Sequence, residues 1–568
     1  MKIGYFSRKN IKNNISYFLE GHSNKNPDKP IFYWVNPELL KPHSEISENS
    51  FNHQSISYKE FTTITSRIAS GYINLGIKYG DRVILFLPMT VNLYLTMSAL
   101  QRIGAIPVFL DSWTGHTHMG TAIQQVQPKA IISFEKAFML LSGISDLIPI
   151  KISVRPTTNN YTASLEELMQ NTSQSPIFPV EQADTALITF TTGSSGVPKG
   201  ADRSHRFLAA QHYALKECIP YKENDVDLPV FPIFSLNNIA SGISTVLPAI
   251  DIGTPQLTDS QILLSQIINC NVNSATLSPS IFNNLARFCI ENKIKIPQLR
   301  RVVTGGAPIS RSHVLDFKKA AKKTEIVVLY GSIEVEPISQ IRDEELISII
   351  SHEDRDEEWV DEGINVGHIV KGLKFKLIKI DKNSIKINYQ RDWKQIEIQS
   401  GDVGELIVSG EHVCQKYYKN QDAFERAKIV DVNGTIWHRT GDLVRIDKDG
   451  YFWIVGRVHN AIKRNGIYLF PVRAEVILKK LPFIIQAAYL GIPDPKTGEQ
   501  ALVVIQPKDK TIIQSKETKK LEVKIRNVLS KNNLPVDSIV FLESIPMDPR
   551  HHSKVEYTQL RKQITEGI

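Results

Sequence analysis

The chain has 568 residues, of which 42% are hydrophobic and 22% are charged, and its 67 Lys and Arg against 59 Asp and Glu give a formal net charge of +8. This composition is typical of a globular protein and excludes a disordered tail or a fibre. At about 150 residues per domain, the length predicts three or four structural units. The pI near 9.0 is compatible with nucleic-acid binding, but both charge signs are mixed along the chain, so we predict a mildly basic solvated surface and no nucleic-acid partner.

The sequence has neither the pattern of a secretion signal nor that of a membrane span. Its first twenty residues contain Lys and Arg but lack the uninterrupted apolar core that a signal peptide requires. The most apolar long stretch, residues 83–100, is interrupted by Pro88, Thr90 and Asn92, so it is interpreted as a buried strand followed by an amphipathic helix. We therefore expect a cytoplasmic protein with at most peripheral membrane contact.

The cysteines lie too far apart in the sequence for a zinc site or a redox motif. Isolated thiols in so long a chain favour a reducing compartment over a disulfide framework. We expect them to be small, buried, apolar residues. They are Cys218, Cys270, Cys289 and Cys414.

In the first part of the chain, short runs rich in Val, Ile, Leu, Phe and Thr alternate with helical patterns. Such alternation predicts an α/β architecture with largely parallel sheets, in which ligands bind beyond the carboxyl ends of the strands. The expected strands are residues 82–87, 106–111, 130–134, 186–192, 275–279, 300–306 and 325–331, and expected helices include 58–75, 262–269 and 312–322.

The pattern of apolar and polar residues changes after residue 341. An acidic, loop-like stretch at residues 352–363 precedes segments in which apolar and polar residues alternate. This period of two predicts a smaller, more antiparallel β unit. The alternating segments are residues 373–380, 384–388, 395–398 and 404–410.

The residue pattern changes again near Gly456. The last part, about 110 residues long, has two helical patterns, two or three short strands and a polar insertion at residues 508–520, and it is large enough for a domain of its own. We predict a large N-terminal domain, residues 1–456, made of parallel-sheet α/β layers plus the small β unit. A small, mobile α+β C-terminal domain is predicted for residues 457–568.

The strongest local signal is TFTTGSSGVPKG at residues 189–200, where a β-rich run opens into a loop. Small residues let backbone N–H groups converge on an anion, hydroxyls add donors and a lysine adds charge, so we predict a phosphate-binding loop. It is not a Walker loop, because that spacing requires glycine at Pro198. A flexible hairpin is the alternative, but it has no use for the lysine or the hydroxyls. The expected phosphate ligands are Thr191, Thr192, Gly193, Ser194, Ser195, Gly196 and Lys199.

The segment TTGSSGVPKG resembles the phosphate loop of the adenylate-forming (AMP-binding) superfamily, which includes acyl-CoA synthetases, fatty-acyl-AMP ligases, luciferases and peptide-synthetase adenylation domains. Further motifs of that family follow here in the same order. Within the superfamily, the segments LPVFPIFSLNNIASG, WHRTGD and PRHHSK look like the long-chain acyl-CoA ligase-like group, which includes the olefin-pathway β-lactone synthetases.

Two upstream motifs carry the resemblance to the adenine side of the family's site. LYGSIE, at residues 329–334, resembles the segment in which an aromatic ring stacks on adenine and a glutamate holds Mg²⁺, here Tyr330 and Glu334. The family's threonine is replaced by Ile333, which removes a phosphate-side hydroxyl. TGGAP looks like the loop that lines the adenine and acyl pockets. The remaining residues assigned to the nucleotide by these motifs are Gly305, Gly306, Ala307, Pro308, Gly331 and Ser332.

Further motifs resemble the ribose side and the hinge. Asp442 of TGDL matches the aspartate that accepts both ribose hydroxyls, a role that suits a pure acceptor, and Arg457 matches the arginine that meets ribose and phosphate. Read alone, the aspartate could be a turn residue and the arginine a surface ion pair. His459 stands where the family has an acidic or lysine hinge residue, and Lys463 and Gly466 match the element that follows.

Near the C-terminus, IPMDPRHHSK occupies the place of the family's catalytic-lysine loop, with Lys554 as the lysine and Ser553 in place of glycine. An ammonium group with Mg²⁺ would offset the repulsion when a carboxylate attacks the α-phosphate. The resemblance also assigns Thr192 and Glu334 to catalysis. The substrate pocket is assigned to His205, Phe231 and Phe234, and for the two phenylalanines core packing is an equal alternative.

The resemblance implies a magnesium-dependent ligase that binds ATP, converts a carboxylic acid, expected to be a fatty acid, into acyl-AMP, and releases pyrophosphate. Rotation of the C-terminal domain would then admit a thiol, expected to be coenzyme A. Alternatives are a β-lactone synthetase acting on a 3-hydroxy acid and a ligase that feeds a separate acyl carrier protein. A nucleotide-binding relic without turnover is a further alternative, motivated by Ile333 and His459.

Overall fold

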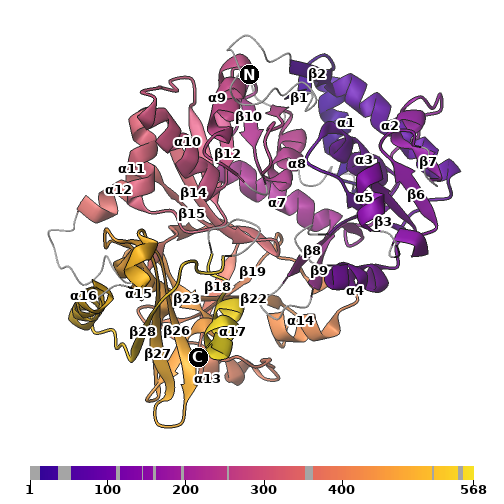
Figure 1. The fold of residues 1–568 in the computed structure, drawn as a ribbon. Coiled ribbons are helices and arrows are strands. Elements are labelled where there is room, and N and C mark those ends of the chain that lie inside the picture. Colours follow the sequence, from indigo (N-terminus) through magenta and orange to yellow (C-terminus); the bar gives the residue numbers. More distant parts are fainter. Residues whose placement is uncertain are drawn as a thin grey trace.

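The computed structural model describes residues 13–35, 53–110, 116–141, 143, 145–157, 161–192, 198–252, 255–351, 363–514, 517–547 and 554–567. Over these ranges the chain is a mixed α/β protein with parallel and mixed sheets, which confirms the predicted fold class. In Figure 1 the first sheet with its helices lies on the right and the second on the left, and the C-terminal elements lie below them.

The first sheet has the strand order β20–β9–β8–β4–β3–β5–β6–β7. In this order, the strands from β8 to β7 are parallel to their neighbours, whereas β9 and β20 pair antiparallel at one edge. Successive residues of a strand point to opposite faces, so Val83 and Leu85 pack with one group of helices and Ile84 with another. The strands are β3 Arg82–Phe86, β4 Ile106–Phe109, β5 Ala130–Ser133, β6 Ile150–Ser153, β7 Ala163–Ser164, β8 Thr185–Thr192, β9 Pro198–Ser204 and β20 Lys416–Tyr417. The helices are α2 Tyr58–Asn74, α3 Val91–Arg102, α4 His116–Val126, α5 Glu135–Leu140 and α6 Leu165–Met169.

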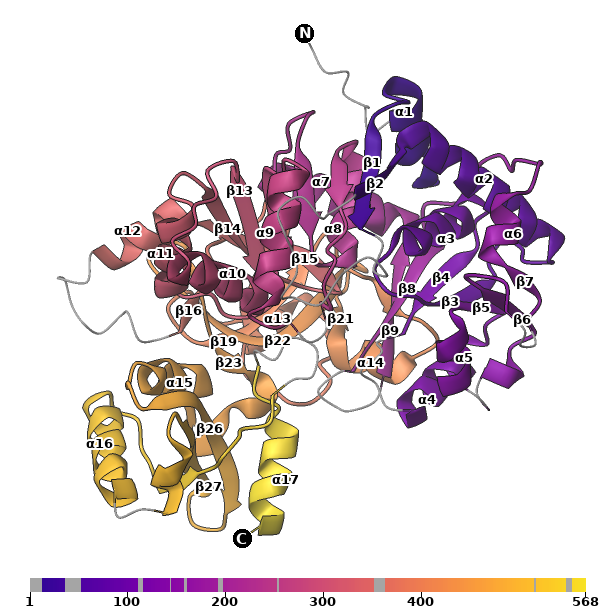
Figure 2. The same cartoon turned by 45° about the horizontal axis from the view of Figure 1, so that its top comes forward.

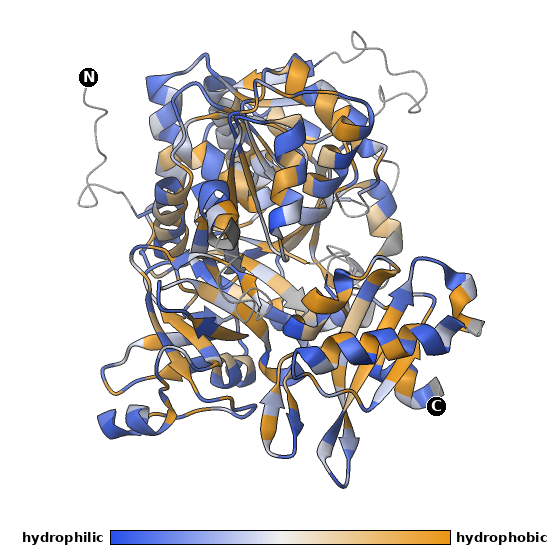
Figure 3. Ribbon diagram, turned by 90° about the vertical axis from the view of Figure 1, so that its left-hand side faces the viewer, coloured by the Kyte–Doolittle hydropathy of each residue, from blue (hydrophilic) through white to orange (hydrophobic). Residues whose placement is uncertain are grey.

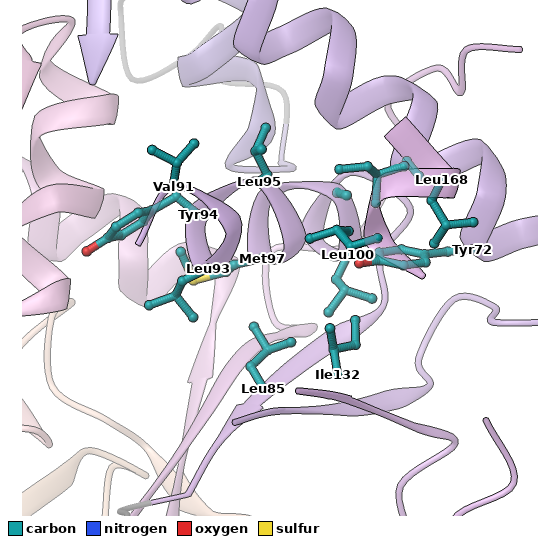
Figure 4. Packing of buried hydrophobic residues seen from close by; sticks show 14 of the residues in the cluster. Tyr72, Leu85, Val91, Leu93, Tyr94, Leu95, Met97, Leu100, Ile132 and Leu168 are labelled. Atoms are coloured by element: carbon teal, nitrogen blue, oxygen red, sulfur yellow. The ribbon is translucent and has the colours of Figure 1, made fainter. Parts of the chain in front are cut away.

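The helix that follows β3 differs from its prediction. We expected α3 to be amphipathic, but residues 93–102 are all buried. Helices α2 and α6 cover the side of α3 that faces away from the sheet, as Tyr72 and Leu168 show in Figure 4. One of its buried polar side chains has a partner: Gln101 donates to the carbonyl of Ala186 at 3.2 Å. The apolar stretch is thus an interior helix.

The second sheet has the order β17–β15–β14–β13–β12–β10–β11–β1–β2 and is parallel from β1 to β14. Helices α9, α10 and α11 pack on one face and α7 on the other, and Figure 3 shows apolar residues concentrated on the strands between the helices. The strands are β1 Pro30–Val35, β2 His53–Ser57, β10 Val226–Pro229, β11 Ser244–Val246, β12 Ser274–Leu277, β13 Arg301–Gly305, β14 Glu325–Ser332, β15 Val335–Arg342 and β17 His368–Ile369. The helices are α1 Ser16–Lys25, α7 His205–Cys218, α8 Pro232–Ser241, α9 Asp259–Asn269, α10 Pro279–Glu291, α11 Arg311–Ala320 and α12 Asp343–Ser351.

The third sheet is antiparallel, as predicted, with the order β16–β23–β22–β19–β18 and β21 paired to β22. Residues 384–388 and 395–398 were expected to be strands, and this was wrong: they lie around a short helical segment. Ile385, Ile387 and Ile396 pack with Trp393 and Trp437. Residues 395–398 meet the sheet only through a single bridge from Glu397 to Ile378 of β18, which is too short to be a strand. The elements are β16 Ile364–Asn365, β18 Lys374–Ile378, α13 Trp393–Ile396, β19 Gly404–Ser409, α14 Gln421–Ala427, β21 Lys428–Val430, β22 Ile436–Ile446 and β23 Phe452–Arg457.

The C-terminal segment has its own sheet and apolar clusters, and it lies beside the rest of the molecule in Figure 2. Helices α15 and α16 cover one face of the sheet β26–β27–β28 and α17 covers the other. We expected two helices and two or three short strands, but the described residues contain more, and β26 and β27 form a long hairpin. The elements are β24 Ile462–Arg464, β25 Ile467–Leu469, α15 Pro471–Lys479, β26 Ile484–Asp494, β27 Gly498–Pro507, α16 Glu517–Lys531, β28 Ser538–Phe541 and α17 Tyr557–Gly567.

Two composition-based predictions can be compared with the fold. The four cysteines are free thiols, and three are buried as expected, whereas Cys270 is half-buried because it follows the last residue of α9. Over the ranges that the structure describes, every helix is too short or too polar to cross a membrane.

Candidate active site

The predicted phosphate loop lies between two antiparallel strands at one edge of the first sheet. β8 ends at Thr192, β9 begins at Pro198, and Thr191 pairs with Lys199 across the two strands. Lys199 is half-buried at the base of the loop. Four expected ligands, Gly193, Ser194, Ser195 and Gly196, lie outside the described residues, so their contact with phosphate stays a prediction.

Glu334 lies in the turn between β14 and β15, and the segment before β20 holds this turn in place. The backbone carbonyl of Glu334 accepts a hydrogen bond from the amide of Cys414 at 2.7 Å. Its Oε1 accepts one from the hydroxyl of Tyr417 at 2.8 Å. Tyr417 also pairs with Ala201 of β9. This short strand therefore brings the turn of the second sheet to the phosphate loop of the first.

Nearby charge outweighs burial in setting the protonation state of Glu334. Burial alone would raise the pKa of this carboxyl, but His438, Lys199 and Lys428, with the Tyr417 hydroxyl, lower the pKa to about 2. Burial lowers the pKa of Lys199, although Glu334 opposes that shift. Glu334 is consequently a carboxylate at neutral pH, and the Lys199 ammonium at the base of the loop attracts it through space.

A lone ionised carboxylate of this kind fits a magnesium ion that is shared with a polyphosphate. Mg²⁺ is usually held by one or two carboxylates together with substrate phosphates and water. Within the described ranges no group of three or more His, Cys, Asp and Glu is arranged to hold a metal. That Glu334 would hold Mg²⁺, with phosphate oxygens completing the coordination, stays a prediction.

Tyr330, Asp442 and Arg457 meet on the other side of the turn. The Tyr330 hydroxyl donates to Oδ2 of Asp442 at 2.6 Å, and Nε of Arg457 lies 2.9 Å from Oδ1. Asp442 and Arg457 are register partners on β22 and β23. Gly441, with φ of +70°, supplies the left-handed turn before the aspartate, a conformation that strains other residues. Asp442, expected at the ribose, therefore contacts both the residue expected at adenine and the arginine expected at ribose and phosphate.

The TGGAP loop follows β13 beside this group. Gly305 ends β13, and a Cβ there would lie 2.2 Å from the carbonyl oxygen of Leu329 on β14. Only glycine allows the two strands to approach so closely. Gly306, Ala307 and Pro308 continue the loop, which places all four predicted residues at the carboxyl end of β13 next to Tyr330.

The two pocket phenylalanines lie together at the start of α8. Their ring centroids are 6.2 Å apart, and Phe234 is buried against Leu215 and residues of β13 and β14. The structure does not bring His205 to them. Its buried ring accepts a hydrogen bond from the amide of Ile15 at 3.3 Å, and Leu215 is ten residues further along α7, about 15 Å away at 1.5 Å per residue. The assignment of His205 to the substrate pocket stays a prediction.

The predicted hinge and lysine residues lie after β23, in the C-terminal part of the chain. Arg457 ends β23 and His459 follows it, exposed, in the short turn Val458–Asn460. Lys463 is exposed on β24, 5.8 Å from the ring centre of Tyr468. Lys554 is exposed at the start of the last described segment, and Val555 next to it bridges to Met547. His551, His552 and Ser553 lie outside the described residues.

Sequence reasoning missed three buried residues behind the phosphate loop: Tyr417, Lys428 and His438. Lys428 and His438 are register partners on β21 and β22, and Lys428 and Lys199 each lie 5.5 Å from the ring centre of Tyr417. No short motif marks them. One of the three could have been suspected from the sequence, because His438 lies in WHRTGD, the same motif as the predicted ribose ligand Asp442.

The chain belongs to the AMP-binding enzyme family, whose model matches residues 19–418. It is 26% identical over 514 residues to olefin β-lactone synthetase of Xanthomonas campestris pv. campestris, covering 88% of this chain and 89% of that protein. It is 24% identical over 536 residues to 4-coumarate–CoA ligase-like 2 of Arabidopsis thaliana, covering 90% and 87%.

The fold is similar to that of solved adenylate-forming enzymes. The ATP-bound MatB structure from Rhodopseudomonas palustris superposes with a TM-score of 0.76 at 17% identity and covers 98% of this chain and 99% of that one. At this identity the likeness concerns the fold alone. Family and fold together establish an enzyme architecture built for adenylate formation.

Proposed function

We propose that the protein uses ATP to convert a carboxylic acid, with a fatty acid as the favoured class, into acyl-AMP with release of pyrophosphate. The observation that carries this proposal is the convergence of Glu334, Lys199, Tyr330, Asp442 and Arg457 around one turn at the carboxyl ends of the strands. Two ionised carboxylates, two cations and an aromatic ring suit a magnesium nucleotide. A plain structural ion-pair network would not need the adjoining glycine loop.

In this mechanism the residues position the reactants and balance charge. Asp442 would accept hydrogen bonds from the ribose, for which Tyr330 and Arg457 must give up part of their present contact. Lys199 and the loop would hold the phosphates. Mg²⁺ on Glu334 would neutralise charge at the phosphoryl oxygens. The carboxylate of the acid attacks the α-phosphorus in line and pyrophosphate leaves.

We further propose that Lys554 reaches this site during adenylation and leaves it afterwards. The predicted boundary at residues 456/457 lies within β23, one residue before that strand ends, and a Cβ on Gly456 would lie 3.3 Å from Pro471 of α15. Rotation there would exchange Lys554 for the second reactant. Coenzyme A, a separate acyl carrier protein and a substrate hydroxyl are the acceptors to be distinguished.

One observation favours a substrate hydroxyl over coenzyme A. Relatives that cover most of this chain include two olefin β-lactone synthetases. In such a reaction the hydroxyl of a 3-hydroxy acid attacks the activated carboxyl carbon, a C–O bond closes the lactone, and AMP leaves. The 4-coumarate–CoA ligase-like relatives support the thioester alternative.

The proposal is tested by measuring pyrophosphate release over a panel of carboxylic acids that includes 3-hydroxy fatty acids. Release with at least one acid is expected; none with any acid, despite ATP binding, would indicate a nucleotide-binding relic. Product masses with and without coenzyme A then assign the second step. A lactone formed without coenzyme A supports the hydroxyl route, and a thioester formed only with it refutes that route.

A further inference from the structure

Lys428 is a buried lysine beside Tyr417, and burial lowers the pKa of its ammonium group although Glu334 opposes that shift. It is the first residue of β21 and is 2% exposed. Its Nζ donates to the backbone carbonyl of Cys414 and lies 5.5 Å from the ring centre of Tyr417. A buried charge is unfavourable unless an opposite charge or a full set of hydrogen bonds compensates it. One carbonyl and one aromatic ring compensate Lys428 only in part.

The described residues offer this ammonium no ion pair of its own. Glu334 is the carboxylate that attracts it through space, and the same carboxylate attracts Lys199. Two ammonium groups therefore share one carboxylate. His438, the register partner of Lys428, adds no negative charge. When both lysines are protonated, the cluster of Lys199, Lys428, Glu334 and Tyr417 carries an excess of one positive charge in a largely buried place, and burial lowers the pKa of both lysines.

The ring of Tyr417 connects the buried charge to the loop. Lys199 and Lys428 lie at equal distances of 5.5 Å from the ring centre, and the hydroxyl of Tyr417 donates to Glu334 at 2.8 Å. Because Tyr417 is itself 4% exposed, little water can enter to screen these charges, and their field at the loop is stronger than that of surface lysines.

We propose that Lys428 is a positioning residue that raises the affinity of the site for polyphosphate, both the triphosphate of ATP and the pyrophosphate product. It acts through Tyr417 and Glu334 and does not touch the nucleotide. The inference rests on the proposed function. Its distinctive consequence is selectivity by charge: AMP, which lacks the β- and γ-phosphates, gains little from Lys428.

The test is calorimetric titration of the full-length protein with pyrophosphate, ATP and AMP, each without Mg²⁺. In Lys428→Met, a change of similar volume, we expect the Kd for pyrophosphate and ATP to rise at least tenfold and that for AMP to change less than twofold. Lys428→Arg, which keeps the charge, should restore part of the pyrophosphate affinity. The matched control is Lys419→Met, because Lys419 also lies over a tyrosine ring, 5.6 Å from that of Tyr418, but is exposed.

An equal loss of affinity for AMP and pyrophosphate would overturn the proposal, since it would mean that Lys428 only supports the fold. Unchanged pyrophosphate affinity in Lys428→Met would overturn it as well. If that variant does not fold, Tyr417→Phe, with Tyr418→Phe as control, must show the same selective loss. A wild-type protein that binds neither ATP nor pyrophosphate would refute the proposed function itself.

Discussion

Asp442 concentrates several interactions on a single carboxylate. One oxygen accepts from Tyr330 and the other pairs with Arg457, while its own amide is held by Thr440 at 3.1 Å. The residue is almost fully buried. Each of its two oxygens therefore has a donor, as a buried carboxylate requires, and those donors come from two different sheets.

Asp442→Asn should therefore weaken ATP binding more than it weakens the fold. The amide loses the charge that holds Arg457 and can accept fewer hydroxyl groups, so we expect the KM for ATP to rise at least tenfold. We expect the free energy of unfolding to fall by only about 1–2 kcal/mol. Steady-state kinetics at varied ATP measure the effect, with the exposed Asp449→Asn as control. An unchanged KM would contradict the ribose assignment.

Ile333 illustrates why one departure from the family motif is tolerated. Its side chain is half-buried against an apolar cluster that includes Phe207, Leu208 and Cys414. A branched hydrocarbon fills this place, whereas a hydroxyl there would need a partner. The departure that motivated the relic hypothesis thus has a packing explanation.

At the scale of elements, the spacing of apolar residues and the local composition identified most strands, because parallel strands that are buried on both faces appear in the sequence as continuous apolar runs. The failures have a common cause in tertiary context. α3 was expected to have an exposed face, but α2 and α6 cover it. Residues 384–388 alternate like a strand but pack on Trp393. Lys428 could not be recognised as part of the site, because its burial depends on pairing between β21 and β22.

Glu475 of α15 makes the stability of the C-terminal unit sensitive to pH. Burial raises its pKa from 4.5 to about 7, although Lys479 and the amide of Tyr489 oppose the shift, and the hydroxyl of Tyr557 at the start of α17 donates to it. The folded state therefore binds more protons than the unfolded state between these pH values. Stability contributed by this group is present below pH 4.5 and is lost as pH rises towards 7.

In Glu475→Gln this loss should disappear. We expect the variant to gain stability relative to the wild type as pH rises from about 4.5 to 7, by up to about 3 kcal/mol. Chemical unfolding over this pH range, compared with the exposed Glu566→Gln, measures the difference. A stability difference that does not vary with pH would contradict the shifted pKa.

At the scale of the whole molecule, the predicted division places Lys554 in the C-terminal unit, together with Arg457 and Lys463, and the other nucleotide residues in the rest of the chain. Lys554→Ala should abolish pyrophosphate release, because no other ammonium group is assigned to the attacking carboxylate. Transfer from acyl-AMP supplied directly should continue at a similar rate. The exposed Lys496→Ala serves as control. Full adenylation in Lys554→Ala would refute the assignment.

The two-residue strand β20 also affects the order in which the molecule can assemble. β20 pairs with β9, which lies more than 200 positions earlier in the sequence, and Tyr417 of β20 donates a hydrogen bond to Glu334 in the turn of the second sheet. Contacts of such long range form late, since the intervening chain must first be ordered. During synthesis, the layers of the first two sheets can therefore form while the phosphate loop still lacks its edge strand. A newly made chain acquires its nucleotide site only after β20 and β21 have left the ribosome.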